Sequence, residues 1–258
     1  MALTGEEYDF VGTLRGEASE LGVSLTDAAL RALRVYAEML AEWNERLNLT
    51  AITAPDEVVT KHFADSLSLL PVIWKYQVAR ENPLRLLDVG TGAGFPGLAL
   101  WAAGVGDVWL LDSVGKRFAF INECAKAMAM EAGSGKTALT PPKTVVMRAE
   151  NAGRLPEMRD SFDAVVARAV SEMRALAELC LPMVRPGGLF YAMKGPSAEG
   201  EAAAARGMIA ELGGEIAGIE TVALRGGLRR SIVVVRKVKA TPEKYPRRFD
   251  VIKKDSKR

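Results

Sequence analysis

Short apolar runs that alternate with helical stretches constrain the fold of this chain more than any other feature. Runs that are apolar throughout indicate strands buried on both faces, as in a parallel sheet covered by helices. Helical spacing at 116–130 and 172–181 supplies two of the connections between them. The sequence therefore predicts an α/β fold with a doubly wound, mostly parallel sheet. The predicted parallel strands are 84–90, 107–112, 144–148, 162–167 and 188–194.

The last two predicted strands depart from this alternation. Residues 214–224 and 231–238 are joined only by a short loop that contains glycine and arginine. So short a connection joins antiparallel neighbours, whereas parallel strands need a crossover. We therefore expect a terminal antiparallel hairpin at one edge of the sheet.

The first 82 residues have helical rather than strand spacing. Thr4 and Glu7 form a capping box before the first predicted helix. A third helix is expected over about 56–70, ending at Pro71 because proline disrupts a continuing helix. These residues are expected to form a helical extension packed on the core.

Charge divides the 258-residue chain into an acidic body and a basic end. The net charge is +2, yet residues 225–258 hold 13 basic and 3 acidic residues. A basic end indicates a partner that carries phosphates, although a solvated tail that aids solubility has the same composition. The predicted units are the extension at 1–82, a ligand-binding domain at 83–238 and a basic C-terminal tail at 239–258.

Composition excludes several classes of protein. Apolar residues make up 49 %, an ordinary globular value, and no apolar run approaches the roughly 18 residues of a membrane helix. The first residues lack the basic and apolar regions of a signal peptide. Cys124, Cys180 and the single His62 exclude a disulfide scaffold and most metal sites. We expect a cytoplasmic protein with no metal and no membrane partner.

A glycine-rich turn at residues 88–97, DVGTGAGFPG, follows the first predicted strand. Its glycines allow a sharp turn and let a ligand approach the main chain. Ligands of open α/β sheets bind at the carboxyl ends of the strands. Asp112 lies 20 residues after Gly92, where an acid would bond ribose hydroxyls. NAD and S-adenosylmethionine fit this pattern equally, since both carry an adenosine ribose.

Three further features favour S-adenosylmethionine. Asp88 can accept a bond from a cationic amino group or a bound water, and it would repel a pyrophosphate. The D-x-G-x-G-x-G pattern and the terminal hairpin are both usual in methyltransferases. A second glycine-rich segment, residues 133–137, resembles the end of a nucleotide-binding loop. It follows a helix and has Met130 where that pattern needs glycine, so neither ATP nor GTP is predicted.

Nine segments match one known family in order. They are 47–50, 61–67, 88–97, 110–117, 148–150, 167–170, 186–188, 194–195 and 244–248. With DVGTGAGFPG and KHFADSL as the most specific of them, the chain resembles the bacterial small-subunit (16S) ribosomal RNA guanine-N7 methyltransferases, the glucose-inhibited division protein B family. It departs from the family pattern in the 132–143 loop and at residues 229–231.

The resemblance implies a class I S-adenosylmethionine-dependent methyltransferase with a Rossmann-like fold. It implies methyl transfer to N7 of a guanosine in 16S rRNA, within the small ribosomal subunit or its assembly intermediate. The product is S-adenosylhomocysteine, and a monomer is expected. Together with the turn, the resemblance gives these cofactor-binding residues: Asp88, Gly90, Gly92, Phe95, Asp112, Ser113, Ala149, Glu150 and Arg168. An ion pair of Arg168 with Asp163 or Glu172 is the alternative reading of that arginine.

The same resemblance, with the basic end, gives a set of RNA-binding residues. We expect Tyr245 to stack on a base or ribose and the basic residues to contact phosphates. For the third helix, the alternative is a surface ion pair of Lys61 with Asp65 beside a packed histidine. The predicted RNA contacts are Lys61, His62, Arg230, Lys244, Tyr245, Arg247 and Arg248.

The sequence offers no catalytic acid or base, and the expected reaction needs none. Guanine N7 carries an unprotonated lone pair, so attack requires alignment rather than deprotonation. Residues 167–170 read ARAV, unlike the N/D-P-P-Y motif of amino-nitrogen methyltransferases. Alternatives are a small-molecule methyltransferase, an NAD-dependent oxidoreductase and a non-catalytic ribosome-assembly factor. The basic end argues against the first, and the intact turn with Asp112 argues against the last.

Overall fold

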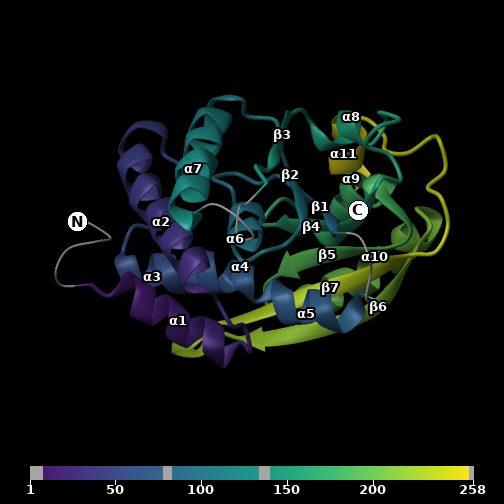
Figure 1. Cartoon of the computed structure of the whole chain (residues 1–258). Coiled ribbons are helices and arrows are strands. Elements are labelled where there is room, and N and C mark those ends of the chain that lie inside the picture. The colour runs from purple at the N-terminus through teal and green to yellow at the C-terminus, as the bar shows by residue number, and fades with distance from the viewer. Residues whose placement is uncertain (1–7, 78–82, 134–139, 256–258) are drawn as a thin grey trace.

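The computed structural model describes residues 8–77, 83–133 and 140–255, which are built around a seven-stranded sheet (Figure 1). The strand order is β3-β2-β1-β4-β5-β7-β6. The strands are β1 (Arg85–Val89), β2 (Asp107–Asp112), β3 (Lys143–Val146), β4 (Phe162–Arg168), β5 (Val184–Lys194), β6 (Gly214–Ala223) and β7 (Arg229–Lys237).

Strands β1 to β5 are parallel to one another, and β7 runs antiparallel to both β5 and β6. The predicted α/β class, the mostly parallel sheet and the terminal antiparallel hairpin are therefore confirmed. The second strand of the hairpin, β7, pairs with β5, so the first strand, β6, lies at the edge of the sheet.

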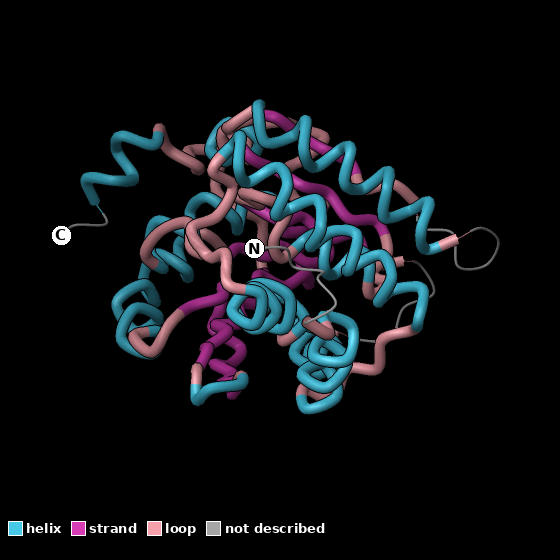
Figure 2. Tube along the Cα trace, turned by 90° about the vertical axis from the view of Figure 1, so that its left-hand side faces the viewer, coloured by secondary structure: helices cyan, strands magenta, loops and turns pink. Residues whose placement is uncertain are grey.

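Helices cover both faces of the sheet, and Figure 2 shows them on either side of the strands. Alternate residues of each strand point to opposite faces. In β4, Ala164 and Val166 pack with the helices of the N-terminal half, whereas Val165 and Ala167 pack with those of the C-terminal half. On the first face lie α1 (Phe10–Glu20), α2 (Asp27–Leu47), α5 (Leu69–Tyr76), α6 (Gly97–Ala102) and α7 (Lys116–Ala132). On the second lie α8 (Ala149–Ala152), α9 (Met173–Cys180), α10 (Ala198–Glu211) and α11 (Phe249–Asp255).

The N-terminal helices share one hydrophobic cluster with the sheet. Phe10, Leu14 and Leu33 of α1 and α2 are buried together with Leu86 and Tyr191 of the strands. The expected capping box at Thr4 and Glu7 lies outside the described residues. The described helix begins at Phe10, and Asp9 accepts a bond from the main chain of Gly12.

The predicted third helix is longer than expected and is irregular. Its segments are α3 (Pro55–Val58), the π-helical turn η1 (Val59–Ala64), α4 (Asp65–Leu67) and α5. The prediction that Pro71 ends it was wrong. A short break at Ser68 places that proline in the first turn of α5, where its missing N–H needs no helical partner.

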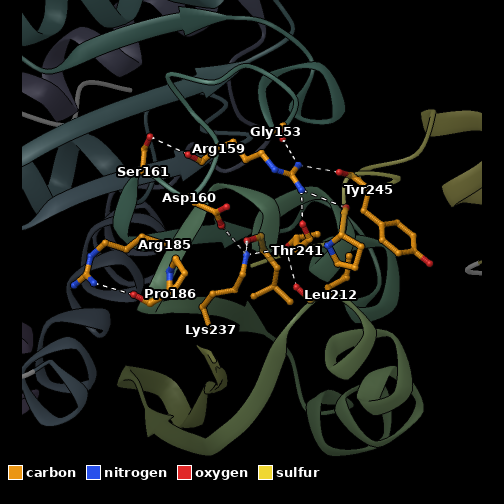
Figure 3. A network of polar contacts seen from close by, with 12 residues as sticks. Gly153, Arg159, Asp160, Ser161, Arg185, Pro186, Leu212, Lys237, Thr241 and Tyr245 are labelled. Carbon is orange, nitrogen blue, oxygen red and sulfur yellow. Dashed lines mark hydrogen bonds and ion pairs between the residues drawn. The ribbon is translucent and has the colours of Figure 1, made fainter. Parts of the chain in front are cut away.

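The C-terminal segment packs on the domain and is not a solvated tail. Tyr245 is only 4 % exposed, and Ile252 of α11 is buried in the second hydrophobic cluster. The Arg159 guanidinium donates to the main-chain oxygens of Thr241, Pro242 and Tyr245 (Figure 3). Arg159 therefore links the C-terminal segment to the rest of the domain by hydrogen bonds.

Lys237, the last residue of β7, anchors the start of the same segment (Figure 3). Its fully buried Nζ donates to the Leu181 carbonyl, to Thr241 Oγ1 at 2.7 Å and to Asp160 Oδ1 at 3.2 Å. Burial lowers the Lys237 pKa to about 8.

In the described ranges, no helix has the length and apolar character needed to cross a bilayer. Half of the predicted 132–143 loop, residues 134–139, lies outside those ranges.

Candidate active site

The glycine-rich turn leaves the carboxyl end of β1 and is braced from beneath by Asp88. Asp88 Oδ2 accepts bonds from Thr91 Oγ1 at 2.6 Å and from the Gly97 main chain at 2.8 Å. Gly90 has φ +73°, and a Cβ there would lie 2.7 Å from a methyl group of Val170. Glycine is therefore required at this position both by conformation and by space.

Asp88 is completely buried, and burial raises the pKa of its carboxyl to about 6. Its second oxygen, Oδ1, has no hydrogen-bond partner within the described part of the chain. An unpartnered buried carboxylate oxygen is costly, which is consistent with the raised pKa of this carboxyl.

Asp112 ends β2 and joins this strand to the turn. Its Oδ2 accepts from the Gly92 main chain at 2.9 Å and from Arg117 Nη1 at 3.1 Å. Its Oδ1 accepts from the Val114 main chain at 2.8 Å. Asp112, which was predicted to bind a ribose, therefore also supports the turn. Its position in the sequence alone did not indicate this second role.

A cavity of about 290 Å³, here called the first cavity, opens at the carboxyl ends of β1, β2, β3 and β4. Three predicted residues of the glycine-rich turn do not line this cavity: Asp88, Gly92 and Phe95. The predicted cofactor residues that line it are Gly90, Asp112, Ser113, Ala149 and Glu150. The structure therefore brings five of the nine predicted residues to one cavity, although they come from three connections.

A second cavity of about 400 Å³ meets the first at Ala169, which lines both. Ala169 has φ +55°, an uncommon conformation for a residue with a side chain. The cavity is lined mainly by charged and polar side chains from distant segments. They include Lys61, His62, Asp65, Arg168, Lys194 and Arg230. Three predicted RNA-binding residues and one predicted cofactor residue therefore share this cavity.

A buried carboxylate holds two arginines in the second cavity. Asp65, whose side chain is 1 % exposed, accepts from Arg168 Nη1 and from Arg230 Nε, each at 2.9 Å. The alternative that paired Arg168 with Asp163 or Glu172 was wrong about the partner, since the ion pair that Arg168 forms is with Asp65. The true partner lies more than 100 residues away, on the helix of the N-terminal extension.

His62 is packed beneath the same arginine. Its ring stacks on Phe95 at 4.8 Å between centroids, and its Nε2 lies 2.8 Å from Thr50 Oγ1. Burial and the nearby Arg168 charge lower the His62 pKa to about 4, so the imidazole is neutral at pH 7. The alternative pairing of Lys61 with Asp65 was wrong, because Lys61 pairs with Glu57.

The predicted RNA contacts of the C-terminal segment lie away from the second cavity. Lys244 and Tyr245 both bond Glu211, at 2.8 and 2.7 Å. Arg247 pairs with buried Glu178, whereas Arg248 has a side chain that is 86 % exposed. A ring as buried as that of Tyr245 has no free face for a base, so the expected stacking does not fit this structure.

Sequence reasoning missed several residues of the two cavities. Asp65 and Lys194 lie inside matched segments, but nothing in their spacing showed that they would meet. Phe249 and Arg148 line the first cavity, and Phe249 carried no sequence signal. Hydrophobic periodicity does not reveal such contacts between distant segments.

Nothing in the described ranges points to covalent or metal chemistry. Cys124 and Cys180 are free and buried, and burial raises the pKa of each thiol. Neither is a thiolate nucleophile at neutral pH. The described residues include no cluster of three metal-ligating side chains.

Comparison with known proteins identifies close relatives of this chain. Residues 29–225 match the family model described as GidB, rRNA small subunit methyltransferase G. The ribosomal RNA small subunit methyltransferase G of Symbiobacterium thermophilum is 43 % identical over 93 % of this chain and 95 % of its own length. The protein of the same name from Bacillus subtilis is 40 % identical, over 89 % and 91 %.

One solved structure gives a fold comparison. The [4+2]-cyclase SpnF aligns with a TM-score of 0.51 at 16 % identity, covering 84 % of this chain and 98 % of that one. At this identity the likeness concerns the fold alone.

Proposed function

Since the chain belongs to the family of rRNA small subunit methyltransferase G, we propose that it methylates N7 of a guanosine in 16S rRNA, with S-adenosylmethionine as donor. The chain is an rRNA methyltransferase with the class I methyltransferase fold. The observation that carries the proposal is the pair of cavities that meet at Ala169. One has the residues of a nucleoside site, and the other is rich in cations.

The residues of the first cavity fit S-adenosylmethionine. Asp112 would hold the ribose hydroxyls, and Ala149 with Glu150 would address the adenine amino edge. Gly90 lines this cavity with its main chain, and buried Asp88, which does not line it, braces the turn behind it. When bound, S-adenosylmethionine supplies an electrophilic methyl group.

The chain's own residues position the acceptor and need not move a proton. Guanine N7 attacks with a lone pair that is already free. Arg168 is held by Asp65 and lies over the Phe95 ring, 5.3 Å from its centroid. In this cavity its guanidinium can donate to guanine O6 or to a phosphate, which would orient N7. Neutral His62 supports the Phe95 ring and is not required as a base.

The RNA-contacting surface that we propose centres on the second cavity. Lys61, His62 and Arg230 line it, and Arg248 and Lys244 are exposed cations farther along the chain. Arg247 also borders a cavity of about 370 Å³ with Arg148 and Arg154, next to the first cavity. The partner would be 16S rRNA in the small subunit or its assembly intermediate. We also propose that the protein acts as a monomer in the cytoplasm.

The proposal is tested by mapping modified nucleosides of 16S rRNA from a deletion strain. One 7-methylguanosine should disappear and should return with the wild-type gene. Arg168→Ala should not restore it, whereas Arg15→Ala, which alters an exposed arginine paired with Asp27, should restore it fully. Persistence of every 7-methylguanosine in the deletion strain would refute the proposed reaction.

A further inference from the structure

Phe249 is an aromatic residue of the C-terminal segment that reaches the first cavity. It begins α11, beyond the residues that match the family model, and its side chain is 37 % exposed. It nevertheless lines the first cavity together with Gly90 and Asp112. The C-terminal segment thus contributes an apolar ring to a cavity whose other walls come from the ends of the parallel strands.

Buried anchors hold this exposed ring in position. Glu178, with 1 % of its side chain exposed, accepts from the Arg247 main chain at 2.7 Å and from its Nε and Nη2 at 3.0 and 2.8 Å. Arg247 Nη1 also reaches Asp255 at the other end of α11, at 2.6 Å. Buried Ile252 fixes the middle of the helix. The ring is therefore placed by contacts on both sides of it in the chain.

The surroundings of the ring leave room for a flat partner. The Arg148 guanidinium lies over the Phe249 ring, 5.8 Å from its centroid, and 37 % of Phe249 nevertheless remains exposed at the edge of the cavity that it lines. Glu150 and Asp112 give the same cavity acceptors for an amino group and for hydroxyls. An aromatic side chain stacks readily on a nucleobase, since every base has a planar face.

We propose that Phe249 stacks on the adenine of the bound methyl donor, so that the C-terminal segment forms one wall of the cofactor site. This inference rests on the proposed function, because it requires an adenosine ligand in the first cavity. It also assigns the Glu178–Arg247 ion pair a positioning role, since this pair sets the place of the ring.

Calorimetry with S-adenosylhomocysteine and with 5′-methylthioadenosine tests the proposal. Phe249→Ala should bind both ligands about tenfold more weakly, the scale of losing one stacked base. Phe249→Trp should keep the affinity, because it keeps the aromatic face. Val251→Ala is the matched control: its side chain is equally exposed on the same helix and does not line the cavity, so its affinity should stay within about twofold of wild type.

The outcomes separate this inference from the proposed function. If wild type binds both ligands and Phe249→Ala binds them equally well, the stacking role is wrong and the proposed function stands. If wild type binds neither ligand, the proposed function fails and the inference fails with it. The Phe249→Trp variant adds a direct readout: the extra indole emission should be quenched by 5′-methylthioadenosine and not by homocysteine. Equal quenching by both would overturn the stacking geometry.

Discussion

The two cavities are built in different ways. The first is formed mainly by the ends of neighbouring parallel strands: Gly90 follows β1, Asp112 ends β2, and Ala149 begins α8 shortly after β3. The second is lined by charged side chains of several distant elements, and Asp65 holds Arg168 and Arg230 among them. Sheet topology thus supplies most walls of the first cavity, with Phe249 added by the C-terminal segment, whereas the second also needs side chains of the N-terminal helices. The extension is therefore expected to control acceptor binding and to leave cofactor binding nearly untouched.

The largest effect should come from Asp65→Asn, which breaks the second cavity and spares the first. Two guanidinium groups lose their buried counterion, which should lower the free energy of unfolding by about 3–5 kcal/mol. Thermal and urea unfolding measure this loss. At a temperature where the variant is folded, its affinity for S-adenosylhomocysteine should stay within about twofold of wild type. A tenfold loss would mean that the two cavities are not separate.

The reverse effect is expected for Asp112→Ala. This change removes the ribose acceptor, so S-adenosylhomocysteine binding should weaken by about 1.5–3 kcal/mol, the scale of a charged hydrogen bond. Because Gly92 and Val114 also lose an acceptor, some stability should be lost too. Asp112→Asn keeps one acceptor for these main-chain groups and separates the two losses. Unchanged affinity in calorimetry would contradict the ribose role.

Glu178→Gln tests whether the C-terminal segment belongs with the first cavity. Loosening Arg247 should reduce S-adenosylhomocysteine affinity by about 1 kcal/mol, because one hydrogen-bonded contact that positions Phe249 is weakened. Truncation after Val238 should go further and destabilise the fold, since it exposes the surface under Tyr245 and Ile252. A truncated chain with wild-type stability and affinity would show that the segment is only solvated surface.

The effect that is smallest at neutral pH concerns the protonation of His62. Its pKa is about 4 in the folded chain against an ordinary value of 6.5, so the unfolded chain binds the extra proton between these values. His62 therefore contributes stability at neutral pH that is lost as the pH falls from about 6.5 toward 4, by at most about 1.4 kcal/mol per pH unit. The raised Asp88 pKa acts in the opposite sense, so wild type is compared with His62→Asn. Identical pH slopes for the two chains would contradict a buried, neutral imidazole.

Local features of the chain could be predicted from its sequence. The strands, the hairpin and the glycine-rich turn depend on spacing within a few residues, and five predicted cofactor residues reach one cavity. The match to a family also located Arg168, in the matched segment 167–170, without showing what holds it.

Contacts between distant segments could not be predicted. The π-helical turn Val59–Ala64 precedes Asp65 within the irregular third helix, so the regular spacing assumed for Lys61 and Asp65 did not apply. The basic end was interpreted from its charge alone. Its acidic partners, Glu178 and Glu211, lie on helices far from it in the chain. Charge counts show how many cations a segment has and not how many are already paired.

The central claim is that Asp65 organises the acceptor cavity independently of cofactor binding. It is tested most directly by single-turnover methylation of small ribosomal subunits from the deletion strain, with 7-methylguanosine measured by mass spectrometry at saturating S-adenosylmethionine. Wild type should form one 7-methylguanosine per 16S rRNA, and folded Asp65→Asn should react at least about 100-fold more slowly, the equivalent of about 2.7 kcal/mol in the barrier. A wild-type rate for Asp65→Asn at saturating donor would contradict the claim.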